Sequence, residues 1–261
     1  MTTDTRPGVP RHPAAFSDPL FPTFERILDE QLGNRRALIL DPFAGIGKVH
    51  QLATERRDTI GVELMPKWAA AHRRTRIGDA SHLDPAWTHG FDAIVTSPCY
   101  GNRMADHHDN ADTCKRCGGL GGLTQNADGE AADRCSLCGG TGLSPRRSYR
   151  HYYGDGFWTD ADPTVNAGVM QWGDTYREFH ERCLVEMHRV LRRRGVLVLN
   201  IGDHYRAGRR QYVSSWWLRA ARRVGFERVE TWTVSLVGHR HGANRDRVGH
   251  EFVHTLRKVT P

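Results

Sequence analysis

The stretch Ala37-Leu-Ile-Leu-Asp41-Pro-Phe-Ala-Gly45-Ile-Gly47 sets the fold expected for this chain. Its first five residues are a short apolar run bounded by turn residues, which predicts a buried strand. The glycines that follow let the backbone turn sharply and approach a ligand, because they carry no Cβ atom. A helix is expected directly afterwards, over Lys48–Arg56. A strand, a glycine-containing turn and a helix in this order predict the first unit of an α/β sheet.

The same alternation of strands and helices continues on both sides of a long irregular stretch. The further strands are expected over 59–63, 76–79, 91–95, 195–200, 228–237 and 251–258, and the further helices over 66–74, 175–193 and 211–224. The last two strands are expected to form an antiparallel pair at the edge of the sheet. The whole pattern predicts a doubly wound, mostly parallel sheet of seven strands.

The bulk composition favours a polyanionic partner and speaks against a membrane span. A length of 261 residues leaves room for one domain and an insertion. The formal net charge is +7 and the pI is about 9.3, a balance that suits nucleic acid, although a genome-wide bias toward arginine accounts for part of it. No run of about 18 apolar residues occurs. Residues 1–13 lack the apolar centre of a signal peptide and are interpreted as a disordered lead-in, so a cytoplasmic location is expected.

Three carboxylates follow three consecutive strands of the expected sheet. Asp41 can accept hydrogen bonds from an ammonium or hydroxyl group, and Glu63 can accept two from a ribose diol. Asp79 is placed to accept from an adenine amino group. The full Gly-x-Gly-x-x-Gly spacing of NAD-binding proteins is absent, so a different nucleoside-bearing cofactor is favoured.

The fourth strand ends in Thr96-Ser97-Pro98-Cys99-Tyr100, a turn that carries the expected catalytic residues. Ligands of open α/β sheets bind outside the carboxyl ends of the strands, where this turn lies. The Ser97 hydroxyl and the Pro98 carbonyl can accept hydrogen bonds from an exocyclic amino group. Tyr100 can stack on a base rotated out of a duplex. The candidate catalytic residues are Ser97, Pro98, Cys99 and Tyr100.

Taken together, these motifs resemble those of DNA amino-methyltransferases, in the version typical of cytosine-N4 enzymes, with Cys99 where the family has a second proline. The segment His12-Pro-Ala-Ala-Phe16-Ser-Asp-Pro-Leu20 is similar to the part of that family that packs on the methionine end of the cofactor. The resemblance implies a Rossmann-like methyltransferase fold, S-adenosylmethionine as cofactor, and duplex DNA with a flipped target base as partner. The cofactor-binding residues that it implies are Phe16, Ser17, Asp41, Phe43, Ala44, Gly45, Gly47, Glu63, Leu64, Asp79, Ala80 and Ser97.

Several other functions stay open at the level of the sequence. Adenine N6 is the nearest alternative target, although that subgroup usually carries aspartate where Ser97 stands, and RNA is an alternative substrate. A third reading uses Cys99 as the nucleophile of a carbon-5 cytosine methyltransferase. Ser97 and Tyr100 fit an amino-methylating motif better, and no Glu-Asn-Val motif accompanies the cysteine. A nucleic-acid-binding protein with an inactive methyltransferase fold is the alternative from another class.

Four of the six cysteines fall in two nearly identical pairs, Cys114-Lys-Arg-Cys117-Gly-Gly and Cys135-Ser-Leu-Cys138-Gly-Gly. Two Cys-x-x-Cys pairs at this separation predict a tetrahedral four-thiolate zinc site. Four thiolates leave no open position for water, so the Zn²⁺ is expected to be structural and to order the irregular stretch. A redox-active dithiol pair is the competing interpretation. The repeats also resemble the zinc-binding units of DnaJ-type chaperones.

The expected organisation is a lead-in over 1–13, a methyltransferase domain over 14–104 and 171–261, and a zinc-binding insertion over 105–170. The insertion is expected to recognise the DNA target, because arginines and tyrosines follow the second cysteine pair and combine phosphate-binding charge with stacking rings. A structural lid is the alternative role. The candidate DNA-binding residues are Arg103, Arg146, Arg147, Tyr149, Arg150 and Asn244.

Overall fold

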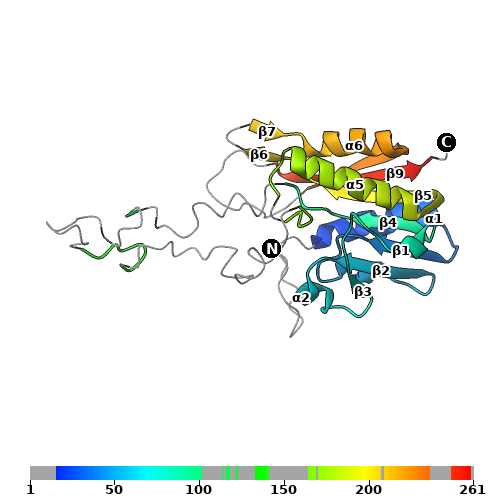
Figure 1. Cartoon of the computed structure of the whole chain (residues 1–261), viewed down its shortest axis with the longest axis horizontal. Helices are drawn as coiled ribbons and strands as arrows, with labels where there is room; N and C mark the ends of the chain where they lie inside the picture. Colours follow the sequence, from blue (N-terminus) through cyan, green and yellow to red (C-terminus); the bar gives the residue numbers. More distant parts are fainter. Residues whose placement is uncertain are drawn as a thin grey trace. The chain divides into compact units, whose positions relative to one another are not determined.

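The computed structural model describes residues 16–101, 114, 116–117, 122, 133–140, 164–168, 170–206, 209–235 and 248–259. The chain divides into two compact units, the first formed by Met1–Asn102 with Asp162–Pro261 and the second by Arg103–Ala161. The helices and strands named below belong to the first unit (Figure 1).

A seven-stranded sheet with the order β3-β2-β1-β4-β5-β9-β8 forms the centre of the first unit. Its strands are β1 (Ala37–Asp41), β2 (Arg57–Glu63), β3 (Thr75–Ile77), β4 (Phe91–Thr96), β5 (Leu191–Ile201), β8 (Phe226–Ser235) and β9 (His250–Lys258). Neighbours from β3 to β5 are parallel, whereas β9 pairs antiparallel with both β5 and β8. The predicted mostly parallel sheet with a closing antiparallel pair is confirmed, and the fold is Rossmann-like, of the methyltransferase type.

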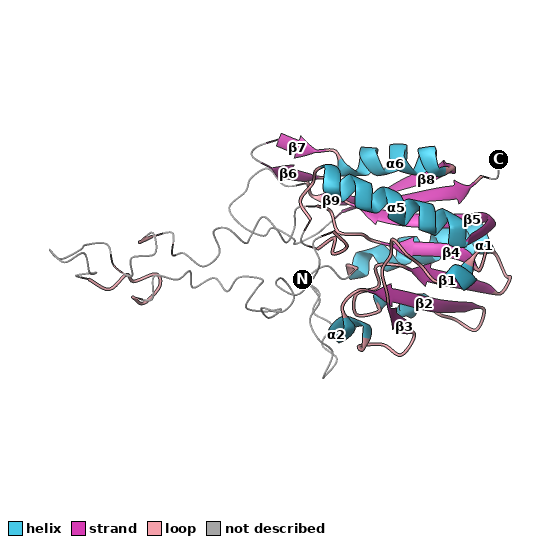
Figure 2. Cartoon of the chain, viewed as in Figure 1, coloured by secondary structure: helices cyan, strands magenta, loops and turns pink. Residues whose placement is uncertain are grey.

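Helices cover the two faces of this sheet (Figure 2). They are α1 (Phe21–Leu32), α2 (Pro66–Ala69), α5 (Asp174–Val190) and α6 (Val213–Val224), with 3-10 helices η1 (Asp18–Leu20), η2 (Lys48–Leu52) and η3 (Pro85–Trp87). Strand side chains alternate between two core clusters, as the period of a strand requires. On β5, Leu197 and Leu199 pack with α5 and α6, while Val196 and Val198 pack with α1.

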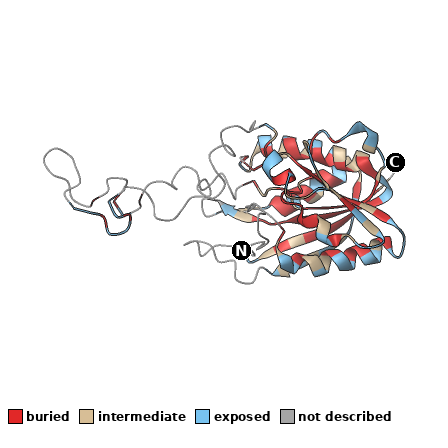
Figure 3. Ribbon diagram, turned by 90° about the horizontal axis from the view of Figure 1, so that it is seen from below, coloured by how far each residue is buried: buried red, intermediate tan, exposed pale blue. Residues whose placement is uncertain are grey.

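Buried residues follow the strands of the sheet and one side of the helices that cover it (Figure 3). Ala167 and Met170 belong to the core cluster that contains α5 and α6, so the chain already packs against the first unit before α5 begins. Each large apolar side chain buried in this way contributes about 1.5–3 kcal/mol. In the described part of the chain, no helix is long and apolar enough to cross a membrane.

Two predicted helices are much shorter than expected. The helix predicted over Lys48–Arg56 is the 3-10 helix η2, which ends at Leu52, because Thr54 then accepts hydrogen bonds from the amides of Arg56 and Arg57 in a turn into β2. The helix predicted over 66–74 stops at Ala69.

Helix α1 and the hairpin of β6 and β7 were not predicted, nor were the short 3-10 helices η1 and η3. The helix α1 begins beside a proline and buries Phe24, Ile27, Leu28 and Leu32, an apolar stripe at helical spacing that was present in the sequence. A small antiparallel hairpin of β6 (His204–Arg206) and β7 (Arg209–Gln211) follows β5, in a stretch with no apolar alternation.

Candidate functional site

Asp41, the last residue of β1, is a buried carboxylate with only one of its oxygens satisfied. Its side chain lies at the carboxyl edge of the sheet and is 1% exposed. Oδ1 accepts hydrogen bonds from the Thr96 hydroxyl at 2.7 Å and from the Phe43 amide at 3.0 Å. Oδ2 has no partner among the described residues. Burial raises the pKa of Asp41 from 3.8 to about 7, an effect that the two hydrogen bonds oppose and the Glu63 carboxylate adds to.

A buried carboxylate oxygen without a partner is costly unless a ligand supplies a donor. A ligand ammonium group suits Oδ2 best, since it brings both a hydrogen bond and the opposite charge. The Ser17 hydroxyl, another predicted cofactor contact, is likewise buried without a partner in the described part of the chain. Both atoms fit the amino-acid end of an adenosyl cofactor.

The segment that holds Ser17 is tied to the glycine turn after β1 by Lys48. This buried lysine donates hydrogen bonds from Nζ to the Phe16 carbonyl at 2.9 Å and to Asp18 Oδ1 at 2.8 Å. Phe16 itself is buried in the core cluster of α1 and is therefore anchored by packing. Lys48 was not predicted as a site residue, although its position directly after the Gly-x-Gly turn was visible in the sequence.

The turn after β1 has a conformation that only glycine adopts without strain. Gly45 and Gly47 have φ angles of +54° and +81°. A Cβ atom on Gly47 would also lie 2.7 Å from Cδ2 of His50 and 2.9 Å from Cβ of His72. Ala44 lies buried in this turn, and its amide donates to the Val62 carbonyl of β2 at 2.9 Å. The turn is therefore held open and close to β2.

Glu63 ends β2 and braces the turn. Its Oε2 accepts from the Gly45 amide at 2.9 Å, and its Oε1 accepts from the Met65 amide at 2.8 Å. Burial raises the pKa of Glu63 to about 6, against the effect of these amide hydrogen bonds. Leu64, another predicted contact, is half-buried next to it. Each carboxylate oxygen has a second lone pair, so the side chain can still receive a diol.

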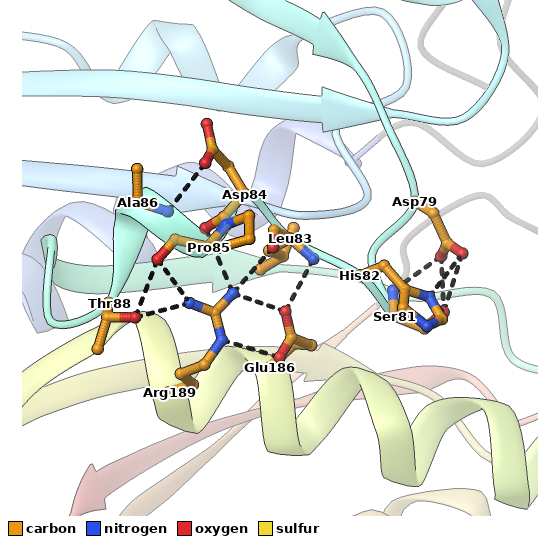
Figure 4. Close-up of polar contacts among 10 residues, drawn as sticks. All are labelled: Asp79, Ser81, His82, Leu83, Asp84, Pro85, Ala86, Thr88, Glu186 and Arg189. Atoms are coloured by element: carbon orange, nitrogen blue, oxygen red, sulfur yellow. Dashed lines mark hydrogen bonds and ion pairs between the residues drawn. The ribbon is translucent and has the colours of Figure 1, made fainter.

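Asp79 follows β3 by two residues and lies in a turn rather than at the strand end itself. Its carboxylate accepts hydrogen bonds from the Ser81 amide and hydroxyl at 2.8 and 2.9 Å, and lies 3.3 Å from Nδ1 of His82 (Figure 4). Ala80, the next predicted contact, is buried. The loop that carries Asp79 is thus ordered by its own side chains.

Helix α5 clamps the continuation of this loop (Figure 4). Glu186 Oε2 accepts from the Leu83 amide at 2.8 Å, and Arg189 donates to the Leu83 carbonyl and to the Thr88 hydroxyl, both at 2.9 Å. The two clamp side chains also pair with each other at 2.7 Å. The Arg189 guanidinium lowers the pKa of Glu186. The clamp residues were not predicted, because their partners lie more than 100 positions away in the sequence.

Arg189→Ala is expected to loosen the loop over residues 79–88. The variant loses charge-assisted hydrogen bonds worth about 1.5 kcal/mol, so the loop amides should exchange their hydrogens about 10-fold faster. Hydrogen exchange followed by mass spectrometry measures this directly. Arg223→Ala, which removes an exposed ion pair of α6 with Glu181, is the matched control. Unchanged exchange over 79–88 in Arg189→Ala would contradict the clamp.

The turn after β4 lies directly next to Asp41, because Thr96, which bonds that carboxylate, precedes Ser97. The Ser97 hydroxyl lies 3.2 Å from the Tyr100 hydroxyl, and the Tyr100 hydroxyl donates to Asn200 Oδ1 at 3.1 Å. The Tyr100 ring packs against Gly202, where an added Cβ would come within 3.1 Å of it. The structure therefore brings the predicted catalytic turn and the first predicted cofactor carboxylate together at one edge of the sheet.

Cys99 in this turn is held as a neutral thiol. Burial raises its pKa to about 12, and the Glu63 carboxylate adds to the effect. Its carbonyl accepts a hydrogen bond from the Tyr176 hydroxyl at 2.6 Å, which fixes the backbone of the turn from α5. A thiol with so high a pKa is a poor nucleophile at neutral pH.

The four predicted zinc ligands come together within the second unit. The Sγ atoms of Cys114, Cys117, Cys135 and Cys138 all lie within 4.8 Å of one another, and all four residues are buried. Two of the Sγ pairs are 3.8 Å apart. A tetrahedral Zn²⁺ with Zn–S bonds of about 2.3 Å requires sulfur separations of about 3.8 Å. The donor set and its spacing fit a four-thiolate metal site, and the cysteines form no disulfide.

The predicted DNA-binding residues Arg103, Arg146, Arg147, Tyr149, Arg150 and Asn244 lie outside the described residues. Their roles stay predictions.

No protein-family model matches the sequence, and no curated protein matches it significantly. Similar solved structures include the 1,6-didemethyltoxoflavin-N1-methyltransferase of Burkholderia thailandensis with bound S-adenosylhomocysteine, at 17% identity over 93% of this chain and 79% of that chain, with a TM-score of 0.46. A SAM-dependent methyltransferase of Methanosarcina mazei matches at 12% identity over 95% and 100%, with a TM-score of 0.48. A Thermus thermophilus protein proposed to be a DNA modification methylase matches at 21% identity over only 33% and 38%, with a TM-score of 0.27. These scores lie below 0.5, so the chain's own strand order defines its fold.

Proposed function

We propose that the protein is an S-adenosylmethionine-dependent methyltransferase. The observation that carries the proposal is the unpaired, buried Oδ2 of Asp41 at the carboxyl end of β1, beside a turn of left-handed glycines. A ligand with an ammonium group and an attached nucleoside fits both features. Glu63, at the end of β2, and Asp79, in the turn after β3, are proposed to receive the nucleoside. The Ser17 hydroxyl, which like Oδ2 is buried and has no partner among the residues that the structure describes, supports the same ligand.

The proposed substrate is an exocyclic amino group of a base in DNA, with N4 of cytosine as the preferred target and N6 of adenine as the alternative. Support comes from the turn Thr96–Tyr100, which offers the acceptors and the ring that an extruded amino-bearing base requires. The formal charge of +7 favours a polyanion. The zinc-binding unit is proposed to contact DNA around the target.

The protein accelerates this reaction mainly by positioning the cofactor and the base. The bound cofactor supplies a methyl group that its sulfonium already activates. Asp41 holds the amino-acid end through its carboxylate, and Glu63 orients the ribose. The Ser97 hydroxyl and Pro98 carbonyl accept hydrogen bonds from the amino hydrogens, which returns electron density to a nitrogen whose lone pair is drawn into the ring. Tyr100 stacks on the base.

Two measurements test the proposal in sequence. Calorimetry with S-adenosylhomocysteine, using Glu63→Ala as the comparison, tests the cofactor; absence of heat with the wild-type protein would overturn the proposal at its first step. Labelled cofactor with DNA and RNA oligonucleotides then tests the polymer, and modified-base sequencing of DNA from cells that express the protein identifies the base. Label in RNA alone would overturn the DNA assignment.

Cys99→Ser is expected to retain activity within about 3-fold, while Tyr100→Ala loses about 100-fold. The first change preserves a small, half-buried side chain that has no part in the proposed reaction. The second removes a stacking interaction of about 1–3 kcal/mol together with a hydroxyl contact. Initial rates of methyl transfer to DNA measure both. Loss of activity in Cys99→Ser, with a covalent adduct on 5-fluorocytosine DNA, would instead favour carbon-5 methylation.

A further inference from the structure

Four side chains form a hydrogen-bonded line from the catalytic turn to β9. The Ser97 hydroxyl lies 3.2 Å from the Tyr100 hydroxyl, which donates to Asn200 Oδ1 at 3.1 Å. Asn200 Nδ2 then lies 3.3 Å from both Glu251 Oε2 and the carbonyl of Phe252. Asn200 and Glu251 are 1% and 5% exposed, so bulk water has little access to their end of the line.

The direction of every hydrogen bond in the line follows from its buried end. The Phe252 carbonyl can only accept a hydrogen bond, and the Glu251 carboxylate also accepts. The end of the Asn200 amide that faces both groups must therefore be its NH₂, which turns Oδ1 toward Tyr100. The two acceptors alone therefore determine which way the Asn200 amide is turned.

The orientation of the Asn200 amide also fixes the hydrogen bonds of the catalytic turn. The Tyr100 hydroxyl has one proton, which it donates to Asn200 Oδ1. In its contact with Ser97, the Tyr100 oxygen must then accept, and the serine hydroxyl donates. The only proton of the Ser97 hydroxyl is used in this contact, so toward a substrate the Ser97 oxygen can act only as an acceptor.

We infer that Asn200 and Glu251 are positioning residues that fix Ser97 as a hydrogen-bond acceptor, so that the site selects substrates presenting an N–H donor. The inference rests on the proposed function and narrows it to amino substrates. A carbonyl or a ring nitrogen without hydrogen would face the lone pairs of Ser97 and be rejected, because two acceptors repel. Three residues, Asn200, Tyr100 and Ser97, separate Glu251 from the substrate, so Glu251 takes no part in the chemistry.

A double-mutant cycle between Tyr100→Phe and Asn200→Leu tests this assignment. Each single variant breaks the line, so the Ser97 hydroxyl no longer has to donate its proton to Tyr100. Each is expected to lower the single-turnover rate of methyl transfer to DNA about 10-fold, which is the effect of one neutral hydrogen bond. Tyr100→Phe keeps the stacking ring. The double variant is expected to be about 10-fold slower than wild type, since the line is already broken in either single variant. A rate about 100-fold lower in the double variant would overturn the inference, because a purely structural role of Asn200 would be additive.

Binding of S-adenosylhomocysteine is the companion measurement. All three variants are expected to bind it within about 2-fold of wild type, because neither Tyr100 nor Asn200, the two residues replaced, is an expected cofactor contact. Weaker binding that parallels the loss of rate would also overturn the inference. A wild-type protein that binds the cofactor but transfers no methyl group to DNA would instead overturn the proposed substrate.

Asn200→Leu leaves the Glu251 carboxylate without its amide partner and can destabilise the fold. Combining Asn200→Leu with Glu251→Gln removes the unpaired charge of Glu251. This combined variant replaces Asn200→Leu in a second double-mutant cycle with Tyr100→Phe. Non-additive rates in that set support the inference as well, and additive rates overturn it. Thermal unfolding confirms that each variant compared is folded at the assay temperature.

Discussion

Replacing Asp41 with asparagine is expected to lower the affinity for S-adenosylhomocysteine about 100-fold. The variant keeps the shape of the side chain and the acceptor for Thr96 and Phe43, but it loses the charge that Oδ2 offers to a ligand ammonium. A hydrogen bond between two charged groups contributes about 1.5–3 kcal/mol, and about 2.7 kcal/mol corresponds to 100-fold. Calorimetry at pH 8 measures the difference.

The matched control is Asp29→Asn, which neutralises an exposed carboxylate paired with Arg57 on the outer surface of α1. It should bind S-adenosylhomocysteine as the wild-type protein does. If Asp41→Asn bound as tightly as this control, the cofactor's ammonium would have to lie elsewhere.

The pH dependence of binding follows from the raised pKa of Asp41. With a pKa of about 7, the carboxyl is largely protonated at pH 6 and cannot attract an ammonium group. Affinity should therefore fall about tenfold for each unit of pH below 7 and level off above it. Asp41→Asn should flatten this dependence.

The same pKa makes the ligand-free protein less stable as the pH rises. The folded state binds the Asp41 proton more tightly than the unfolded state, whose pKa is near 3.8, so stability from this group is lost between pH 4 and pH 7. The change amounts to about 4 kcal/mol for a shift of about three units. Without ligand, the difference in melting temperature between Asp41→Asn and the wild-type protein should therefore be more favourable to the variant at pH 8 than at pH 5.

Removal of metal is expected to unfold the second unit and leave the first intact. The purified protein should contain one equivalent of Zn²⁺, and Cys135→Ser should abolish its binding, because three thiolates lose the closed tetrahedral site. Structural Zn²⁺ sites of this kind contribute about 10–16 kcal/mol of binding free energy. Once the metal is removed, the second unit should therefore become sensitive to proteases over residues 103–161. Metal analysis, limited proteolysis and thermal unfolding measure the three effects.

Cys99→Ser is the matched control, since Cys99 is a half-buried free cysteine of the first unit, outside the thiolate cluster. It should retain the full metal content. A wild-type protein without metal, whose mass falls by about 2 Da for each disulfide formed on mild oxidation, would favour the redox dithiol interpretation instead.

Local sequence patterns were sufficient for the sheet and for the residues that directly follow its strands. Asp41 and Glu63 end apolar runs, and parallel strands bring their ends together. The cysteine spacing likewise predicted the thiolate cluster. The strand predictions depend on patterns within about ten residues. The metal-site prediction depends on two short Cys-x-x-Cys pairs and the distance between them.

Residues that act through long-range contacts could not be predicted in this way. Arg189 reaches the loop after β3 from α5, and Glu251 reaches Asn200 across the register of β5 and β9. A charged side chain on a helix or strand has the same local pattern whether it faces solvent or a partner. The partners are set by the register and by the packing of elements, which local periodicity does not determine.

The division of the chain has a consequence for how such a protein can diverge. All seven strands of the sheet lie before Arg103 or after Ala161, so the second unit interrupts the connection between β4 and α5. Lengthening a surface connection is thermodynamically mild, since each doubling of its length costs about 0.6 kcal/mol. Evolution can therefore exchange or enlarge this intervening segment while the ancestral scaffold, with its register and its strand-end carboxylates, stays unchanged.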